Sequence, residues 1–172
     1  MSWWTTAIYD TCSLITIDKL LQEKRSLSRC FPKKLLALDV SLTADQMYAE
    51  TATRMRELVE ICPLPPPVEL KALLTSADLS KSLSEVDKLL FATAIHTQCA
   101  VVTGDRRLAL ALRRQDLVVG NMALILKDLV QIKKLTSAVV EVLLQRLADR
   151  RDFVLGTPTP TWNDLRDYKF PD

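Results

Sequence analysis

Apolar residues fall into short runs and helical stripes along the chain. The short runs are rich in β-branched residues, which is typical of buried strands, and they stand at Thr6–Asp10, Leu35–Val40, Ala100–Val102 and Leu117–Gly120. Elsewhere apolar residues recur at the spacing of amphipathic helices. These helices are expected around Leu14–Leu21, Ala44–Ile61, Pro67–Leu74, Asp87–His96, Arg106–Arg114 and Ser137–Arg150, whereas Met122–Leu129 fits either type of element.

Strands that alternate with helices predict a parallel sheet covered on both faces. The expected fold class is therefore α/β: a three-layer α/β/α sandwich with a central parallel sheet of about four strands. Composition changes after Arg150, where proline, glycine and tryptophan replace the helical periodicity. We therefore expect one domain over residues 1–150 and a C-terminal extension over residues 151–172.

Composition narrows the class of protein. The chain has 172 residues, 48% of them hydrophobic, which suits one packed core and argues against disorder. A formal net charge of +2 gives no global electrostatic reason to expect a nucleic-acid partner. The four cysteines form no C-x-x-C pair and there is one histidine, so zinc is not indicated. Without a signal-peptide pattern or a bilayer-length apolar run, a cytoplasmic location and no membrane contact are expected.

Common catalytic motifs are missing from the sequence. The three glycines form no phosphate-binding loop, and no G-x-S-x-G motif accompanies the lone His96. We expect His96 to be a packed or capping group. The two adjacent tryptophans, Trp3 and Trp4, are expected to pack at the N-terminus rather than stack on bases.

Three aspartates stand at the ends of predicted elements. Asp10 ends the first strand, Asp105 follows the strand Ala100–Val102, and Asp87 opens a helix. Ligands of open α/β sheets bind beyond the carboxyl ends of the strands, so Asp10 and Asp105 meet if their strands are neighbours. Because like charges at close range disfavour ionisation, such a group favours a hard divalent cation such as Mg²⁺.

Each aspartate also has a structural interpretation, which is favoured when it is taken singly. Ser84-x-x-Asp87 resembles a capping box, and Asp10 and Asp105 can each cap the following helix. A fourth acid, Glu50, lies off the apolar stripe of its helix, where a glutamate is usually only solvated.

The order of these acids resembles that of the PIN domain family over about residues 6–130. The opening motif is similar to Asp10-Thr-Cys-Ser13, and the second acid corresponds to Glu50 on a helix after the second strand. Asp87, before an alanine-containing helix, and Thr103-Gly104-Asp105 after a buried strand, complete the pattern. Cys12 departs from it, because the family usually has Ser or Asn there.

The resemblance implies a Mg²⁺- or Mn²⁺-dependent endoribonuclease that cleaves single-stranded RNA. Many members of the family are toxins paired with an antitoxin, and many form homodimers, so both are expected here by resemblance. On that basis Asp10 and Asp105 are the leading metal ligands, and Glu50 and Asp87 bind directly or through water. Residues expected near the metal or the phosphate are Thr11, Ser13 and Thr103. Candidate RNA contacts are Arg106, Arg107, Arg113 and Arg114. An equally favoured alternative is that these arginines form a solvated helix face.

Two other functions stay open. The chain can be a PIN-like module that binds RNA or protein without cleaving, or a toxin held inert by an antitoxin peptide. Binding of Mg²⁺ to the folded state alone raises its apparent stability, so a metal titration separates the nuclease from the binding module.

Overall fold

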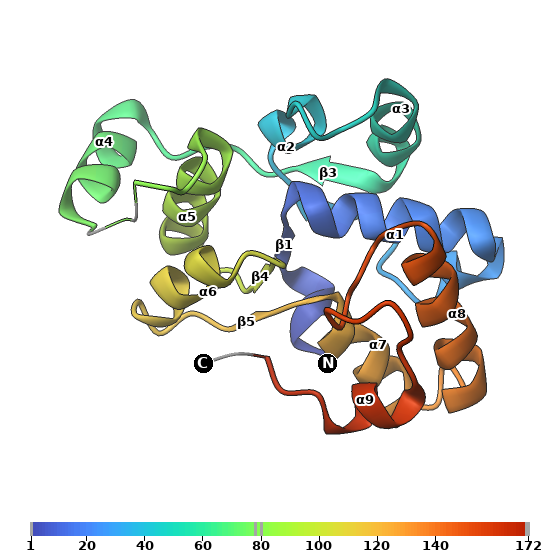
Figure 1. Ribbon diagram of the computed structural model, residues 1–172. Coiled ribbons are helices and arrows are strands. Elements are labelled where there is room, and N and C mark those ends of the chain that lie inside the picture. Colours follow the sequence, from blue (N-terminus) through green and yellow to red (C-terminus); the bar gives the residue numbers. More distant parts are fainter. Residues whose placement is uncertain (1, 78, 80, 171–172) are drawn as a thin grey trace.

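A computed structural model describes residues 2–77, 79 and 81–170 of the chain (Figure 1). Within these residues the sheet has five strands, all parallel, in the order β3-β2-β1-β4-β5. The strands are β1 (Ile8–Tyr9), β2 (Leu35–Ala37), β3 (Val59–Ile61), β4 (Val101–Val102) and β5 (Val119–Gly120). The helices are α1 (Thr11–Glu23), α2 (Asp39–Thr43), α3 (Ala49–Leu58), α4 (Pro67–Ser76), α5 (Glu85–Thr97), α6 (Arg106–Arg113), α7 (Met122–Gln131), α8 (Ser137–Asp149) and α9 (Trp162–Asp167), with 3-10 turns at Trp3–Thr6 and Arg25–Arg29.

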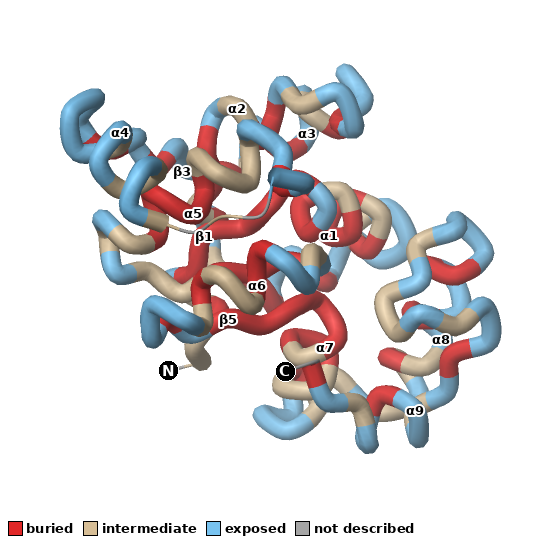
Figure 2. The backbone as a smooth tube through the Cα atoms, turned by 60° about the vertical axis from the view of Figure 1, so that its left-hand side comes forward, coloured by how far each residue is buried: buried red, intermediate tan, exposed pale blue. Residues whose placement is uncertain are grey.

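The side chains of the central strands alternate between two hydrophobic clusters. Tyr9 and Val102 belong to one cluster, with apolar residues of α1, α3, α7 and α8, whereas Ile8 and Val101 belong to the other, with α5 and α6. Helices therefore cover both faces of the sheet, and the predicted three-layer α/β/α sandwich is confirmed. Strands β1, β4 and β5 are buried throughout at the centre of the molecule (Figure 2), whereas Glu60 and Ile61 of β3 are exposed.

Strand order places a crevice at the middle of the sheet. The chain runs outward from β1 through β2 to β3, and then crosses to β4 and β5 on the other side of β1. Ile8 pairs with Leu36 on one side and with Val101 on the other. Because the strand order reverses between β1 and β4, their carboxyl ends flank the position where ligands of such sheets bind.

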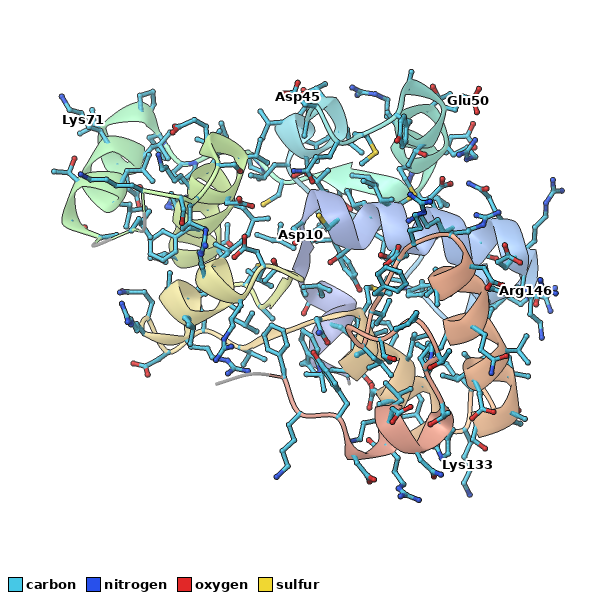
Figure 3. The ribbon with its side chains drawn as sticks, viewed as in Figure 1. Asp10, Asp45, Glu50, Lys71, Lys133 and Arg146 are labelled. Carbon is cyan, nitrogen blue, oxygen red and sulfur yellow. The ribbon has the colours of Figure 1, made fainter. Side chains whose placement is uncertain are left out.

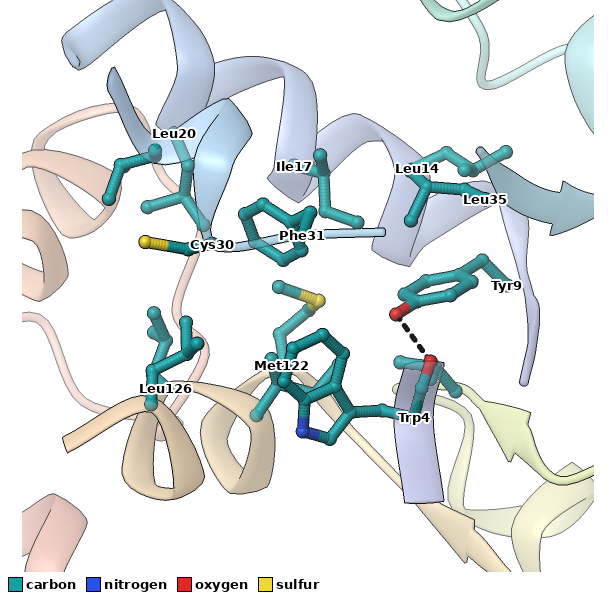
Figure 4. Close-up of a cluster of buried hydrophobic side chains, with 14 of the residues drawn as sticks. Trp4, Tyr9, Leu14, Ile17, Leu20, Cys30, Phe31, Leu35, Met122 and Leu126 are labelled. Carbon is teal, nitrogen blue, oxygen red and sulfur yellow. Dashed lines mark hydrogen bonds between the residues drawn. The ribbon is translucent and has the colours of Figure 1, made fainter. Parts of the chain in front are cut away.

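The N-terminal tryptophans pack into the protein, as expected. Trp4 has no exposed surface, meets Phe31 edge to face at 6.2 Å between ring centroids, and donates from Nε1 to Asp128 at 2.7 Å. Tyr9 donates its hydroxyl proton to the Trp4 carbonyl oxygen at 2.9 Å (Figure 4). Gly120 has to lack a side chain, because a Cβ there would collide with the Trp3 ring.

One strand was missed by the sequence analysis. The helix expected over Ala44–Ile61 spans only Ala49–Leu58, and the next three residues form β3 beside β2. Val59 and Ile61 are β-branched, which favours a strand. They pair with Leu35 and Ala37, and these contacts decide against continuing the helix.

Other expected elements differ in their ends or type. The first strand is shorter than Thr6–Asp10, because Trp3–Thr6 forms a 3-10 turn. The segment Met122–Leu129 is helical, as α7, and Asn121 caps it by accepting from the Leu124 N–H at 3.2 Å. His96, expected to be a packed or capping group, is exposed in the last turn of α5, where its Nδ1 lies 2.7 Å from Glu69 Oε1.

The C-terminal extension lies against the rest of the protein. Thr161 and Asp164 form a capping box that starts α9, which the sequence analysis did not predict, and Leu165 on this helix is fully buried. The helices that the described residues form have 13 residues or fewer, and none of them is long and apolar enough to cross a lipid bilayer.

Candidate functional site

Four aspartates from distant parts of the chain line one cavity, which we call the acidic pocket. Asp10 follows β1, Asp45 lies between α2 and α3, Asp87 is in the first turn of α5, and Asp105 precedes α6. The cavity has a volume of about 430 Å³. Among the described residues that line it, none is lysine or arginine. The expected meeting of Asp10 and Asp105 at the carboxyl ends of β1 and β4 is confirmed.

Asp10 is the buried member of the group, with 5% of its surface exposed. Its Oδ1 accepts the Ser13 N–H at 2.6 Å, and its Oδ2 accepts the Gly104 N–H at 3.2 Å. Burial raises the pKa of Asp10, and hydrogen bonds from Ser13, Thr103 and Gly104 oppose the rise without cancelling it. The ionised carboxylate is thus held by neutral groups, so a bound cation would stabilise it.

Asp105 and Thr103 stabilise the turn Thr103-Gly104-Asp105, which donates the Gly104 N–H to Asp10. Asp105 Oδ1 accepts the N–H groups of Arg107 and Leu108, at 2.7 and 3.0 Å, and so caps α6. The Asp105 N–H donates to Oγ1 of Thr103, which is fully buried, at 3.0 Å. Both capping bonds go to Oδ1, so Oδ2 of Asp105 is not engaged in capping.

Asp87 forms the capping box that the sequence predicts. Its Oδ2 accepts the Ser84 hydroxyl at 2.6 Å and the Ser84 N–H at 3.2 Å, while Ser84 Oγ accepts the Asp87 N–H at 3.1 Å. The capping contacts expected of Asp10, Asp87 and Asp105 are therefore all present. They fix the three carboxylates at the rim of one pocket, so capping and a role in binding are compatible.

Glu50 does not line the acidic pocket. Its side chain is 92% exposed on α3 and lies 4.0 Å from Arg54. Arg54 in turn holds the buried Asp18 in a two-pronged ion pair, with a closest contact of 2.7 Å. Figure 3 shows Glu50 at the outer edge of the molecule, far from Asp10. The structure thus brings together three of the four predicted acids.

Asp45 lines the pocket in place of Glu50. Asp45 was not predicted as a site residue, because the pattern of Ala44–Ile61 indicated a single helix. A signal was present: Asp45 and Gln46 are polar and lie in the loop between α2 and α3.

Cys12 lies at the junction of this pocket with a second one. Its Sγ donates to Gln46 Oε1 at 3.4 Å. Burial of the sulfur, followed by the charges of Asp10, Asp87, Asp152 and Asp105, raises the pKa of Cys12 to about 11. Burial is the larger cause, and the four carboxylates, among them Asp152 of the C-terminal extension, add to it.

Three of the remaining predicted residues line one of the two cavities, whereas Thr103, Arg107, Arg113 and Arg114 line neither. Thr11 lines the acidic pocket and donates to the Ser41 carbonyl oxygen at 3.2 Å. Ser13 donates to the Val102 carbonyl oxygen at 3.3 Å and, with Arg106, lines the second cavity. Arg107 and Arg114 are exposed on α6, and the guanidinium of Arg113 lies 5.0 Å from the Phe170 ring centroid.

The chemistry of these side chains suits a hard cation, although their spacing does not form a ready-made cage. Carboxylates and hydroxyls are the oxygen ligands that Mg²⁺ and Mn²⁺ prefer. Over the part of the chain that is described, no three His, Cys, Asp or Glu side chains gather closely enough to hold an ion by themselves. Mg²⁺ commonly takes one or two carboxylates and several waters, so a pair of aspartates is sufficient.

The sequence matches no protein-family model, and a search of curated proteins finds no matching relative. The resemblance to the PIN family accordingly stays a prediction, supported by the order of the acids alone.

Proposed function

We propose that this protein is a divalent-metal-dependent endoribonuclease that cleaves single-stranded RNA in the acidic pocket. The observation that carries the proposal is the convergence of Asp10, Asp45, Asp87 and Asp105 at one strand edge, where no described lysine or arginine lines the cavity to offset their charge. Four carboxylates in such a place repel one another, and a bound divalent cation relieves that repulsion.

Asp10 and Asp105 would hold the ion, with Asp87 and Asp45 binding directly or through water. When bound, Mg²⁺ or Mn²⁺ polarises a phosphoryl oxygen and makes a water nucleophilic near neutral pH. The chain's own part is to fix the geometry. The turn Thr103-Gly104-Asp105 donates its Gly104 N–H to Asp10 and orients Asp105 through the α6 amides, so the two carboxylates keep their relative position before RNA arrives.

The negative charge of the acidic pocket also affects how RNA binds. A pocket of four aspartates repels a phosphodiester in the absence of metal, so a bound divalent ion is expected to strengthen RNA binding. Thr11 supplies a hydroxyl at the pocket wall, and Arg106 stands on the adjoining wall, where a guanidinium suits a backbone phosphate.

A non-cleaving, PIN-like module that binds RNA or protein is the second candidate. The capping bonds of Asp10, Asp87 and Asp105 favour it, because helix capping alone accounts for an aspartate at each of these positions. This candidate predicts that millimolar Mg²⁺ leaves the melting temperature unchanged.

The test is cleavage of end-labelled single-stranded RNA with Mn²⁺, with and without a chelator. Asp10→Asn and Asp105→Asn should each abolish metal-dependent cleavage. Asp116→Asn serves as the matched control, since Asp116 is exposed in a turn with φ of 59°, a conformation that asparagine also adopts readily. Cleavage that persists in both pocket variants, or in the presence of chelator, would refute the proposal.

The remaining expectations concern partners and place in the cell. A cytoplasmic location, an antitoxin partner and a homodimer belong to the proposal through the family resemblance alone. A mass measurement in solution, with the chain alone and with the product of any short neighbouring gene, tests the two partners.

A further inference from the structure

A second cavity, which we call the tail pocket, adjoins the acidic pocket. It has a volume of about 220 Å³ and shares Cys12 with the acidic pocket. One wall is formed by the starts of α1, α6 and α7. The facing wall comes from the two ends of the C-terminal extension, namely residues 152–154 and the pair Tyr168 and Phe170.

Contacts to the domain hold both ends of the extension in place. Asp152 Oδ2 accepts from Thr16 Oγ1 at 2.9 Å and pairs with Lys19 Nζ at 3.0 Å. At the other end, Asn121 Nδ2 donates to the Tyr168 hydroxyl oxygen at 2.7 Å, and the Phe170 ring is 7% exposed. A wall that is already ordered lowers the entropy cost of binding.

The tail pocket combines an aromatic surface with polar groups. Phe153 is 48% exposed at the pocket, so its ring is accessible to a stacking partner. Unpaired bases of RNA stack on such aromatic side chains. Arg106 brings a positive charge to the same cavity, where a backbone phosphate would pass.

Asp152 gives the pocket a preference among bases. Its bonds to Thr16 and Lys19 both use Oδ2, so they leave Oδ1 outside this network. Carboxylates accept hydrogen bonds from exocyclic amino groups of bases. Adenine, cytosine and guanine carry such a group, whereas uracil presents a carbonyl oxygen in its place.

We propose that the tail pocket binds one unpaired RNA base adjacent to the scissile phosphate, stacks it on Phe153, and favours amino-bearing bases over uracil through Asp152. The proposal rests on the proposed function, since it takes RNA to be the substrate of the neighbouring acidic pocket. It assigns the C-terminal extension a part in substrate selection.

Binding is measured in the full-length Asp10→Asn background, with chelator, by fluorescence anisotropy of labelled oligoadenylate, oligocytidylate and oligouridylate. Phe153→Ala should weaken oligoadenylate binding by about 5- to 150-fold, the range for the loss of one base–aromatic stack. Val142→Ala is the matched control, because Val142 is 54% exposed on α8, outside both pockets, and it should bind as the background does.

Asp152→Asn tests base selection, because an amide keeps the shape of the carboxylate and can donate to uracil. Its preference for oligoadenylate over oligouridylate should fall or reverse. Equal affinities of the Phe153→Ala and Val142→Ala proteins, an unchanged base preference in Asp152→Asn, or no binding of any oligonucleotide would overturn the inference.

The two proposals fail separately. If the wild-type protein cleaves RNA and Phe153→Ala binds normally, the inference is wrong and the nuclease stands. If Phe153→Ala loses binding while the wild-type protein cleaves nothing with Mn²⁺, the nuclease is wrong, and the tail pocket belongs to a module that only binds RNA.

Discussion

Replacing Asp10 by asparagine should change how stability depends on metal and on pH. The buried carboxylate of Asp10 has a raised pKa, caused first by burial. Between the unfolded and folded pKa values the native state therefore holds more protons than the unfolded state, and stability falls as pH rises through that window. Asparagine is neutral at every pH, so Asp10→Asn should lack this fall.

The magnitude follows from two opposing terms. The asparagine amide can keep the bond from the Ser13 N–H, but it presents a donor to the Gly104 N–H and loses that bond, at a cost of about 1 kcal/mol. Removing the buried charge offsets this cost, because burial outweighs the hydrogen bonds in the net direction of the Asp10 pKa. Near neutral pH without metal, we expect an unchanged or higher melting temperature for Asp10→Asn.

Bound metal should reverse the order of the melting temperatures, so that the wild-type protein melts above Asp10→Asn. An ion that binds only the folded state adds about 1.4 kcal/mol at ten times its Kd. For a domain of this size that is a rise of roughly 3–6 °C in melting temperature. The wild-type protein and Asp116→Asn should show this rise with Mg²⁺, and Asp10→Asn should not.

The assay is thermal unfolding followed by circular dichroism, across a pH series and a Mg²⁺ series. Two results would refute the reasoning. One is an Asp10→Asn protein that melts several degrees lower without metal, which makes Asp10 a simple cap. The other is an equal response of the wild-type and Asp10→Asn proteins to Mg²⁺.

Three further predictions concern separate parts of the molecule. Asp45→Asn should lower RNA cleavage and Glu50→Gln should change it little, because only Asp45 lines the pocket; the reverse order would support the family assignment of Glu50. Leu165→Ala should lower the free energy of unfolding by about 2–5 kcal/mol, since Leu165 is fully buried; a loss below about 1 kcal/mol in urea titration would show that the extension detaches. Alkylation of Cys12, followed by mass spectrometry, should accelerate up to about pH 11, and a plateau near pH 9 would contradict the raised pKa of this thiol.

The strands and helices next to the site were predictable because their signals are local. Asp10 and Asp105 follow short apolar runs, and the pairing of Ile8 with Val101 places them at one edge. The capping box at Ser84 and Asp87 was likewise readable from its spacing.

The missed features depend on contacts between distant residues. Val59–Ile61 becomes a strand by pairing with β2, although the preceding residues are helical. Treating Ala44–Ile61 as one helix concealed Asp45, which lies in the loop before α3. The packing of the extension depends on its contacts with α7 and α8, for example from Tyr168 to Asn121. No periodicity within residues 151–172 could reveal these contacts.

The location of a bound ion tests the central claim most directly. Crystals of the wild-type protein soaked with Mn²⁺ and measured near the manganese absorption edge reveal the ion by its anomalous scattering. We predict a peak in the acidic pocket within coordination distance of both Asp10 and Asp105, and none in crystals of Asp10→Asn. A peak only elsewhere on the surface, or no peak in the wild-type pocket, would contradict the account.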